Sequence, residues 1–155
     1  MPYLIDGNNV MAQTIGWHRN KAGARKRLIR ELAGFVAVHR VRVQVVFDGR
    51  PDEEFPEGTK YRSVRVLYAR QGSDADSRIK EIIRKSSYKR DMIVVSSDRE
   101  LVSFANRKGT KVITSGKFRK MLDEATVTNR SKAEVGVGEP VDIDDWIEFF
   151  NRTEH

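Results

Sequence analysis

Three short, mostly apolar runs in this chain each lead to an aspartate. The runs cover residues 3–5, 45–47 and 94–97, and the aspartates that follow them are Asp6, Asp48 and Asp98. If the runs are neighbouring parallel strands, their carboxyl ends lie along one edge of a sheet, where open α/β sheets bind their ligands. Carboxylates that converge there repel one another unless a cation lies between them. The spacing therefore predicts a site for a hard divalent cation.

Further polar side chains stand where they could join this site. Asp74 and Asp76 open a helical pattern between the second and third runs, and Asn8 and Asn9 follow Asp6. An asparagine side chain can orient a carboxylate or bind a phosphate. Mg²⁺ or Mn²⁺ held by such carboxylates lowers the pKa of water and stabilises a leaving oxygen. The chemistry that these residues indicate is metal-assisted hydrolysis.

Each aspartate taken alone also has a purely structural explanation. Aspartate is common in turns and helix starts that follow strands. Residues 97–100 match a helix-capping pattern, Asp48 precedes a glycine as in many turns, and Asp76 lies three residues after Ser73 as in a capping box. The functional hypothesis depends on the coincidence of several acidic side chains at one predicted edge.

Other chemistries lack their motifs in this chain. It contains no cysteine, which excludes disulfides, thiolate zinc sites and cysteine nucleophiles. It has no phosphate-binding Walker loop, no dinucleotide-binding glycine motif after the first strand and no Gly-x-Ser-x-Gly elbow. The haloacid-dehalogenase phosphatases carry a second aspartate two residues after the first, and that position is Asn8 here.

The elements that would position the aspartates alternate along the chain. We expect strands at residues 2–5, 41–47, 64–68, 92–95 and 111–113, from their β-branched composition. We expect helices from the N-cap Asn20 to about residue 36, and at residues 73–87, 99–107 and 117–122; in the first of them Arg25 falls on the outer face. Alternating strands and helices predict an α/β fold, in which helices cover both faces of a mostly parallel sheet.

The length of 155 residues fits one domain with a real core. We place this domain at residues 1–122. Residues 123–155 are expected to form a polar linker and an acidic C-terminal helix, at 144–150, that packs on the body. No apolar stretch is long enough to span a membrane and no secretion signal begins the chain, so we expect a cytoplasmic protein without a membrane partner.

The charge of the chain is uneven. Its net charge is +7, and residues 139–155 hold six acidic side chains and one basic one, so that residues 1–138 carry +12. So many basic residues indicate that the surface binds a polyanion, rather than that it is only exposed to water. Arginine and lysine neutralise phosphates, and tyrosine can stack on unpaired bases. The candidates for contact with RNA near the acidic edge are Arg50, Lys60, Tyr61, Arg62, Tyr68, Arg70 and Arg78.

Four segments together make a family recognisable. Residues 4–10, 46–49, 74–79 and 95–100 resemble, in order and spacing, the bacterial YacP-like branch of the NYN-domain nucleases. The resemblance covers residues 1–122. It implies a PIN-like three-layer α/β sandwich and a metal-dependent endoribonuclease, with Mg²⁺ or Mn²⁺ as the cofactor and RNA, free or in a ribosomal context, as the partner.

The same resemblance assigns roles to the residues that match the motifs. Asp6 would be the first metal ligand, with Asn9 beside it in the catalytic site. Asp48 and Asp76 would be further ligands, and Asp98 would hold the metal directly or through water. Asp74 is the alternative to Asp76, which we prefer because Ile79 follows it at the spacing of the family.

Two other functions remain open from the sequence. One is a non-catalytic RNA-binding module of the same fold, although such a relative is expected to lack one or more of the four aspartates, and all four are present. The other is a small-substrate phosphatase, which would need little of the basic surface. Neither the RNA target nor the oligomeric state is predicted by these motifs.

Overall fold

One six-stranded sheet forms the centre of the protein. The structure is a computed structural model that describes residues 2–87 and 89–135. The strands are β1 (Pro2–Asp6), β2 (Arg42–Phe47), β3 (Lys60–Tyr61), β4 (Val64–Tyr68), β5 (Ile93–Val95) and β6 (Lys111–Ile113), in the order β3-β4-β2-β1-β5-β6. All neighbouring strands are parallel except β3, which runs antiparallel to β4.

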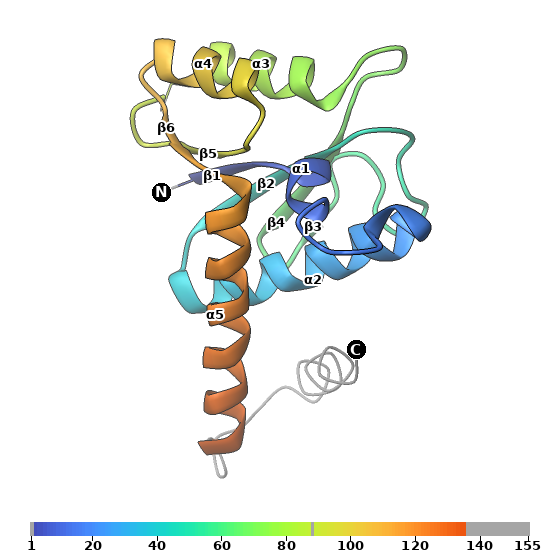
Figure 1. The fold of residues 1–155 in the computed structure, drawn as a ribbon, viewed down its shortest axis with the longest axis vertical. Coiled ribbons are helices and arrows are strands. Elements are labelled where there is room, and N and C mark those ends of the chain that lie inside the picture. Colours follow the sequence, from blue (N-terminus) through green and yellow to red (C-terminus); the bar gives the residue numbers. More distant parts are fainter. Residues whose placement is uncertain (1, 88, 136–155) are drawn as a thin grey trace.

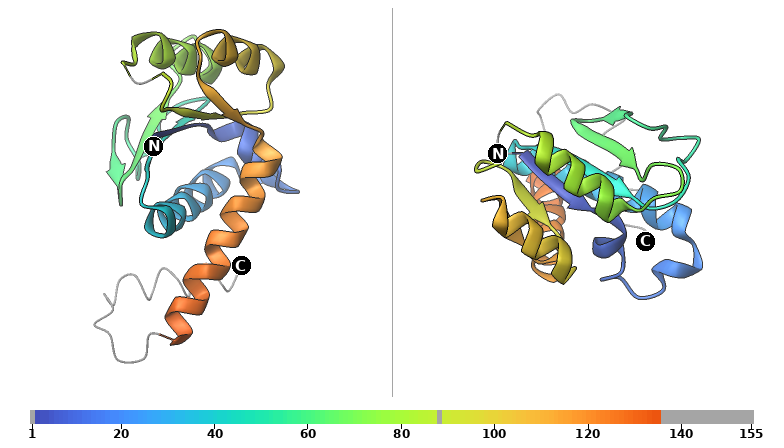
Figure 2. Two further views of the ribbon diagram at one scale, coloured as in Figure 1. Left: turned by 90° about the vertical axis from the view of Figure 1, so that its left-hand side faces the viewer. Right: turned by 90° about the horizontal axis from the view of Figure 1, so that it is seen from above.

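Helices cover both faces of this sheet (Figure 1). They are α1 (Gly7–Met11), the short 3₁₀ helix η1 (Trp17–Arg19), α2 (Lys21–His39), α3 (Ala75–Lys85), α4 (Arg99–Arg107) and α5 (Ser115–Val135). The helices α1, α2 and α5 lie on one side, and α3 and α4 lie on the other (Figure 2). The predicted α/β sandwich with a mostly parallel central sheet is confirmed.

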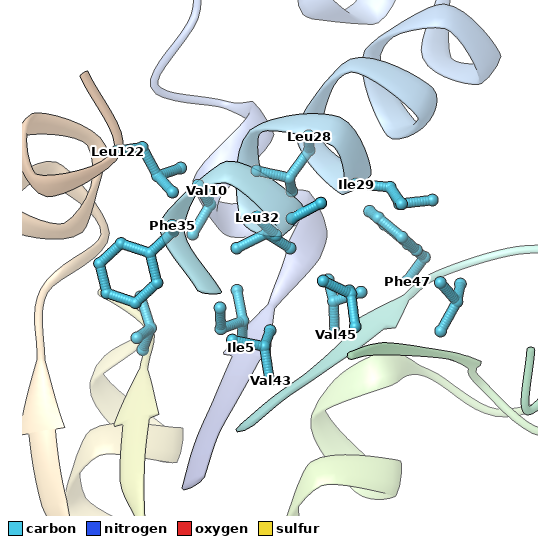
Figure 3. Close-up of a cluster of buried hydrophobic side chains, with 14 of the residues drawn as sticks. Ile5, Val10, Leu28, Ile29, Leu32, Phe35, Val43, Val45, Phe47 and Leu122 are labelled. Carbon is cyan, nitrogen blue, oxygen red and sulfur yellow. The ribbon is translucent and has the colours of Figure 1, made fainter. Parts of the chain in front are cut away.

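The apolar runs of the sequence are continuous because both faces of the central strands are buried. In β2, the side chains of Val43, Val45 and Phe47 point towards α2, whereas Val46 points towards α3. The larger of the two resulting cores joins β1, β2 and β4 to α1, α2 and α5 (Figure 3). Because successive side chains alternate between two packed layers, a shift of one residue would exchange the two sets, and the strand register is fixed.

The connections after β1 and β5 leave the sheet on opposite sides. The chain continues from β1 into α1 and α2 on one face, and from β5 into α4 on the other face. Since β1 and β5 are hydrogen-bonded neighbours, their carboxyl ends form a topological switch point, the place where open α/β sheets bind ligands.

Polar side chains begin three of the helices. Asn20 accepts a hydrogen bond from the Gly23 amide at the start of α2, as its place in the sequence predicts. Asp74 caps α3 and Asp98 caps α4 in the same way. The predicted helix at 73–87 therefore begins two residues later than expected, because Asp74 and not Ser73 is its cap.

One expectation about the elements is wrong, and one strand was not predicted. The helix expected at residues 117–122 is α5, which begins at Ser115 and continues to Val135, so residues 123–135 are helical and not a polar linker. Leu122 and Ala125 on this helix are buried against α2. The strand β3 was not expected at all. It forms a hairpin with β4 whose two turn residues, Arg62 and Ser63, both have positive φ.

The helix expected at residues 144–150 lies outside the described residues, and the division of the chain at residue 122 stays a prediction. Among residues 2–87 and 89–135, no helix combines the length and the apolar character that a membrane crossing requires.

Candidate active site at the carboxyl edge of the sheet

Asp6 is the last residue of β1 and lies at the switch point. Its side chain is buried, with 8% of the residue exposed. The parallel pairing of Ile5 with Val95 brings the next residue of each strand together, and the Ser96 hydroxyl donates a hydrogen bond of 3.0 Å to Asp6 Oδ2. The first aspartate of the predicted set is thus held in place from the neighbouring strand.

The surroundings of Asp6 favour its protonated form. The pKa of the Asp6 carboxyl is raised to about 6, chiefly by burial and to a smaller extent by the negative charges of Asp48 and Asp98. Hydrogen bonds from Ser96 and from the backbone of Asn9 act in the opposite direction and lower this pKa. Asp48 and Asp98 are therefore close enough to act on Asp6, as the sequence predicts for strands that end at one edge.

Asp48 follows β2 and joins three segments of this edge. Its Oδ1 accepts a hydrogen bond of 2.7 Å from the Ala75 amide at the start of α3. Its own amide donates to Asn8 Oδ1 at 3.1 Å, and its carbonyl accepts from the Arg25 guanidinium. One oxygen of the Asp48 carboxylate thus satisfies an unpaired amide of a helix N-terminus.

Asn9 and two serines form a second polar connection across the edge. Asn9 Oδ1 accepts hydrogen bonds from the Ser97 amide, at 2.9 Å, and from the Ser115 hydroxyl. The Ser115 amide in turn donates to Ser97 Oγ at 3.0 Å. These bonds fix α1 to the end of β5 and to the first residue of α5, so the Asn9 side chain has a single position.

Asp98 is exposed and serves as the cap of α4. Its Oδ1 accepts a hydrogen bond of 3.1 Å from the Leu101 amide, and its own amide donates to Ser96 Oγ. Ser96 therefore contacts both Asp6 and Asp98. The capping role that the sequence suggested for Asp98 is present, and its proximity to Asp6 is present as well.

The two aspartates at the start of α3 differ in their surroundings. Asp74 is exposed, and hydrogen bonds from Ser77 lower the pKa of its carboxyl. Asp76 forms an ion pair of 2.9 Å with Lys80, which also pairs with Glu100 of α4 at 2.9 Å. The other oxygen of Asp76, Oδ1, is buried and has no hydrogen-bond partner.

The donor atoms at this edge suit a hard cation, but their present positions do not enclose one. Carboxylate oxygens are the ligands that Mg²⁺ and Mn²⁺ prefer, and the unpartnered Asp76 Oδ1 is an oxygen of this kind. Within the described part of the chain, no three acidic or histidine side chains are close enough together to hold a metal ion. Asp48 and Asp98 each give one oxygen to a helix amide, and Asp76 faces Lys80. The ligand set therefore stays a prediction.

The basic residues predicted to contact RNA differ in exposure and in ion pairing. Arg50, Lys60 and Arg62 are exposed. Arg70 is exposed too but pairs with Glu81, and Arg78 is half-buried and pairs with Glu57.

The two tyrosines of the set are less accessible than the sequence suggests. Tyr61 is half-buried with its ring edge-to-face on Phe55. Tyr68 is 1% exposed and its hydroxyl donates to the Phe55 carbonyl. The expectation that Tyr68 stacks on a base is therefore wrong.

Several polar residues of this edge were not selected from the sequence. Ser96 and Ser115 contact the predicted site residues Asp6 and Asn9, and Arg25 bonds the carbonyls of Asp48 and Arg50. Arg25 is half-buried, with its guanidinium 5.6 Å from the centre of the Phe47 ring, and not on the outer face. The only sequence signal for Ser96 was its place directly after a strand.

We expect Ser96→Ala to raise the pKa of Asp6 above its present value of about 6. The substitution removes the hydrogen bond that stabilises the charged carboxylate, while burial of Asp6 is retained. The side-chain carboxyl titration of Asp6, followed by NMR, measures the change. Ser97→Ala is the matched control, because the Ser97 side chain contacts Ser115 and not Asp6; an equal shift in both variants would contradict the role of Ser96.

Comparisons with known proteins agree with this fold. The family model described as YacP-like NYN domain matches residues 3–140 of the chain. Two crystal structures of Rae1 (YacP) from Bacillus subtilis, one of them of a point mutant, superimpose with TM-scores of 0.70 for the mutant and 0.67 for the other. Each is 18% identical to the chain and covers 99% of it, and the chain covers 97% and 94% of their lengths. At this identity the likeness concerns the fold. No curated protein matches the chain significantly.

Proposed function

The chain belongs to the YacP-like NYN domain family, and from that premise we propose that it is a metal-dependent endoribonuclease. Its reaction would be the hydrolysis of RNA phosphodiester bonds at the carboxyl edge of the sheet, in the cytoplasm. Water would attack the phosphate in line and leave 5′-phosphate and 3′-hydroxyl ends.

The observation that carries this proposal is the state of Asp6. A carboxylate that is buried, placed at a topological switch point and close to two further negative charges is unfavourable by itself. Strongly perturbed acids in such a place are typical of functional sites. A cation that binds there would offset the repulsion among Asp6, Asp48 and Asp98. Cation binding therefore accounts for the closeness of these three acids, which helix capping does not.

The residues that would hold Mg²⁺ or Mn²⁺ are Asp6, Asp48, Asp76 and Asp98, with Asp74 as the alternative to Asp76. A bound cation would supply an activated water and positive charge for the leaving oxygen. Asp76 would contribute its unpartnered Oδ1 to the cation. Its ion pair with Lys80 through Oδ2 would keep an ammonium beside the site for a phosphate oxygen of the substrate.

The polar residues around Asp6 would keep this edge in one arrangement during the reaction. The Ser96 hydroxyl fixes the orientation of the Asp6 carboxylate, and Asn9 is locked between the end of β5 and the start of α5. Positions fixed before the substrate binds reduce the reorganisation that the reaction requires. Above a pH of about 6, Asp6 would be ionised in most molecules and able to hold a cation.

Incubation of defined RNAs with the protein and Mn²⁺ tests the proposal. We expect internal cleavage that EDTA stops and that an excess of Mn²⁺ restores, with 5′-phosphate ends at the cuts. Cleavage that EDTA does not affect would contradict the metal-dependent mechanism. Binding of RNA without any cleavage would identify the protein as a non-catalytic RNA-binding module.

A competition experiment separates the nuclease from a phosphatase. Hydrolysis of a chromogenic phosphate ester would be measured with and without long RNA. If RNA is the substrate, the ester is a poor substrate and RNA suppresses its hydrolysis. Fast hydrolysis of the ester that RNA leaves unchanged would favour a small-substrate phosphatase.

A further inference from the structure

A groove of about 920 Å³ lies along α3. Its lining includes the apolar side chains of Ile82, on α3, and Met92, next to β5, and also Gln44 of β2. It extends from Arg70, after the end of β4, to the amino ends of β1 and β2. The helix α3 along which it lies packs on β1 and β2.

The side chains around this groove are predominantly basic. Five cations line it, namely Arg40, Arg42, Arg70, Arg78 and Lys85, against the two acids Glu81 and Asp91. Glu81 accepts hydrogen bonds from both Arg70 and Lys85, which lower the pKa of its carboxyl to about 2. This acid therefore stays ionised and arranges two cations along the helix while it neutralises only one charge.

Arg40 and Arg42 are exposed, and within residues 2–87 and 89–135 neither has an ion-pair partner. Arg40 also has a left-handed backbone, with φ 54° and ψ 47°, at the C-cap of α2. Glycine is the usual residue at such a position, because a side chain there is strained. Arg40 thus lines the groove with a cation although its left-handed backbone is strained.

The sheet beside the groove continues this basic surface. Arg65 of β4 pairs in register with Gln44, which lines the groove, and with Lys60 of β3 on its other side. Side chains directly opposite each other in a sheet share a face, and two like charges there repel. Arg65 and Lys60 are both exposed, and in the described part of the structure neither pairs with an acid. A polyanion would remove this repulsion.

We propose that the groove binds a single strand of RNA that continues from the bond to be cut, an inference that rests on the proposed function. The phosphates would lie along the cations of the groove, and unpaired bases would stack on the guanidinium planes of its arginines, as in other single-strand sites. Continuity with the acidic edge supports RNA as the occupant, because α3 has Asp74 as its N-cap, Asp76 in its first turn and the groove residue Lys85 in its last turn. Arg70 and Arg78, selected from the sequence for contact with RNA, line the same groove.

Binding of a labelled RNA of 16 nucleotides to the full chain in EDTA tests the groove without any need for cleavage. The groove variant is Arg40→Gly with Arg42→Gln, in which glycine removes the backbone strain and so protects folding. The control variant is Lys120→Gln with Arg130→Gln, which removes two exposed cations of α5, on the face of the sheet opposite α3 (Figure 2). Both variants lower the net charge by the same amount.

We expect the groove variant to lose affinity by about 25-fold at 0.1 M salt, and the slope of affinity against salt on logarithmic axes to decrease by about 1.4. The control should change little. A separate variant, Arg65→Gln, should lose about fivefold in affinity, and thermal unfolding should show it at least as stable as the wild type because it removes the repulsion of Lys60.

Equal losses in the groove and control variants would overturn the proposal, since binding would then be unspecific attraction to a basic surface. Loss of affinity for a mononucleotide with unchanged affinity for RNA would also overturn it and would assign the groove to a free nucleotide. The proposed catalysis is tested apart from this. If RNA binds in the groove but Mn²⁺ produces no cleavage, the nuclease proposal fails and the groove proposal stands.

Discussion

Asp6→Asn is expected to abolish Mn²⁺-dependent cleavage of RNA and to make the metal-free protein more stable at pH 7. The loss of activity should be about 1000-fold or more, because the substitution removes a charged ligand from the proposed cation site and cation stabilisation of the transition state amounts to several kcal/mol. The gain in stability follows from the burial of the Asp6 carboxyl among other acids.

The sign of the stability change follows from the pKa of Asp6 in the two states. The pKa is 3.8 for an ordinary aspartate and about 6 in the folded protein. Between these values the folded protein holds a proton that the unfolded chain has lost, so its stability decreases as the pH rises through this window. The decrease amounts to roughly 3 kcal/mol, and the uncharged amide of the Asp6→Asn variant would avoid it. The advantage of the variant should be small below about pH 4 and reach its full size above about pH 7.

Urea unfolding in EDTA at a series of pH values between 4 and 8 measures this difference. Asp74→Asn is the control, because Asp74 is exposed at the same edge, the pKa of its carboxyl is lowered and asparagine caps helices as well; it should bring no gain in stability at pH 7. Identical pH dependence of Asp6→Asn and the wild type would show that Asp6 does not carry a raised pKa. Undiminished cleavage by a pure Asp6→Asn protein would refute its catalytic role.

The opposite effects on stability and activity would distinguish a functional acid from a structural one. A residue that serves only to cap or to turn the chain stabilises the fold, and its removal costs stability. A buried carboxylate that lowers the stability of the fold is retained when the activity depends on it. Mn²⁺ should stabilise the wild type by mass action and leave Asp6→Asn nearly unchanged.

The sheet could be predicted from the sequence because its central strands are buried on both faces. Such strands are β-branched and apolar throughout, as in residues 43–47, and this pattern does not depend on the rest of the fold. The cap Asn20 was predictable for a similar reason, since it acts on an amide only three residues away. Local chemistry sufficed for these elements.

The hairpin of β3 and β4 could not be predicted because its turn lacks the usual residues. Two-residue hairpin turns need positive φ at both positions and normally contain Asn-Gly or Asp-Gly. Here Arg62 and Ser63 occupy them, with φ 48° and 68°. The extent of α5 was hidden by its polar composition, because only a few side chains beyond Leu122, such as Ala125, reach the α2 surface.

The position of the candidate site could be predicted from the sequence, but the hydrogen bonds within it could not. The aspartates at strand ends follow from the pattern, whereas the partner of Asp6 is Ser96, 90 residues away, and that of Asn9 is Ser115, 106 residues away. Such pairs depend on strand order, and no local signal marks them. The ion pair of Asp76 with Lys80 is a local exception, because Lys80 lies one helical turn away on α3. The second partner of Lys80, Glu100, lies on another helix and has no local signal.

We expect Gly7→Ala to destabilise the protein by about 3 kcal/mol, the upper range for overpacking of a rigid core. Gly7 is buried and follows Asp6 at the first position of α1. A Cβ atom there would lie 2.5 Å from Cδ1 and Cε1 of the Phe47 ring and 3.0 Å from Cγ2 of Val45. Both neighbours are fully buried between the sheet and α2, so neither can move aside cheaply.

The control for this substitution is Gly116→Ala in the first turn of α5. Its Cβ would meet only the end of the Gln13 side chain, at 3.4 Å, and alanine is favoured over glycine in a helix. This variant should be as stable as the wild type or more so by up to about 1 kcal/mol. Urea unfolding of both variants gives the comparison, and a Gly7→Ala protein as stable as Gly116→Ala would contradict the close packing of α1 on Phe47.

The effect of Gly7→Ala should extend to the candidate site, because relief of the clash requires α1 to move away from the sheet. Asn8 and Asn9 lie on α1 and hold the amides of Asp48 and Ser97, so a shift of α1 would loosen both loops beside Asp6. Cleavage of RNA by the folded fraction should therefore fall at a temperature where the variant is still native by circular dichroism. A variant that is destabilised but cleaves at the wild-type rate per folded molecule would show that the position of α1 does not matter for the reaction.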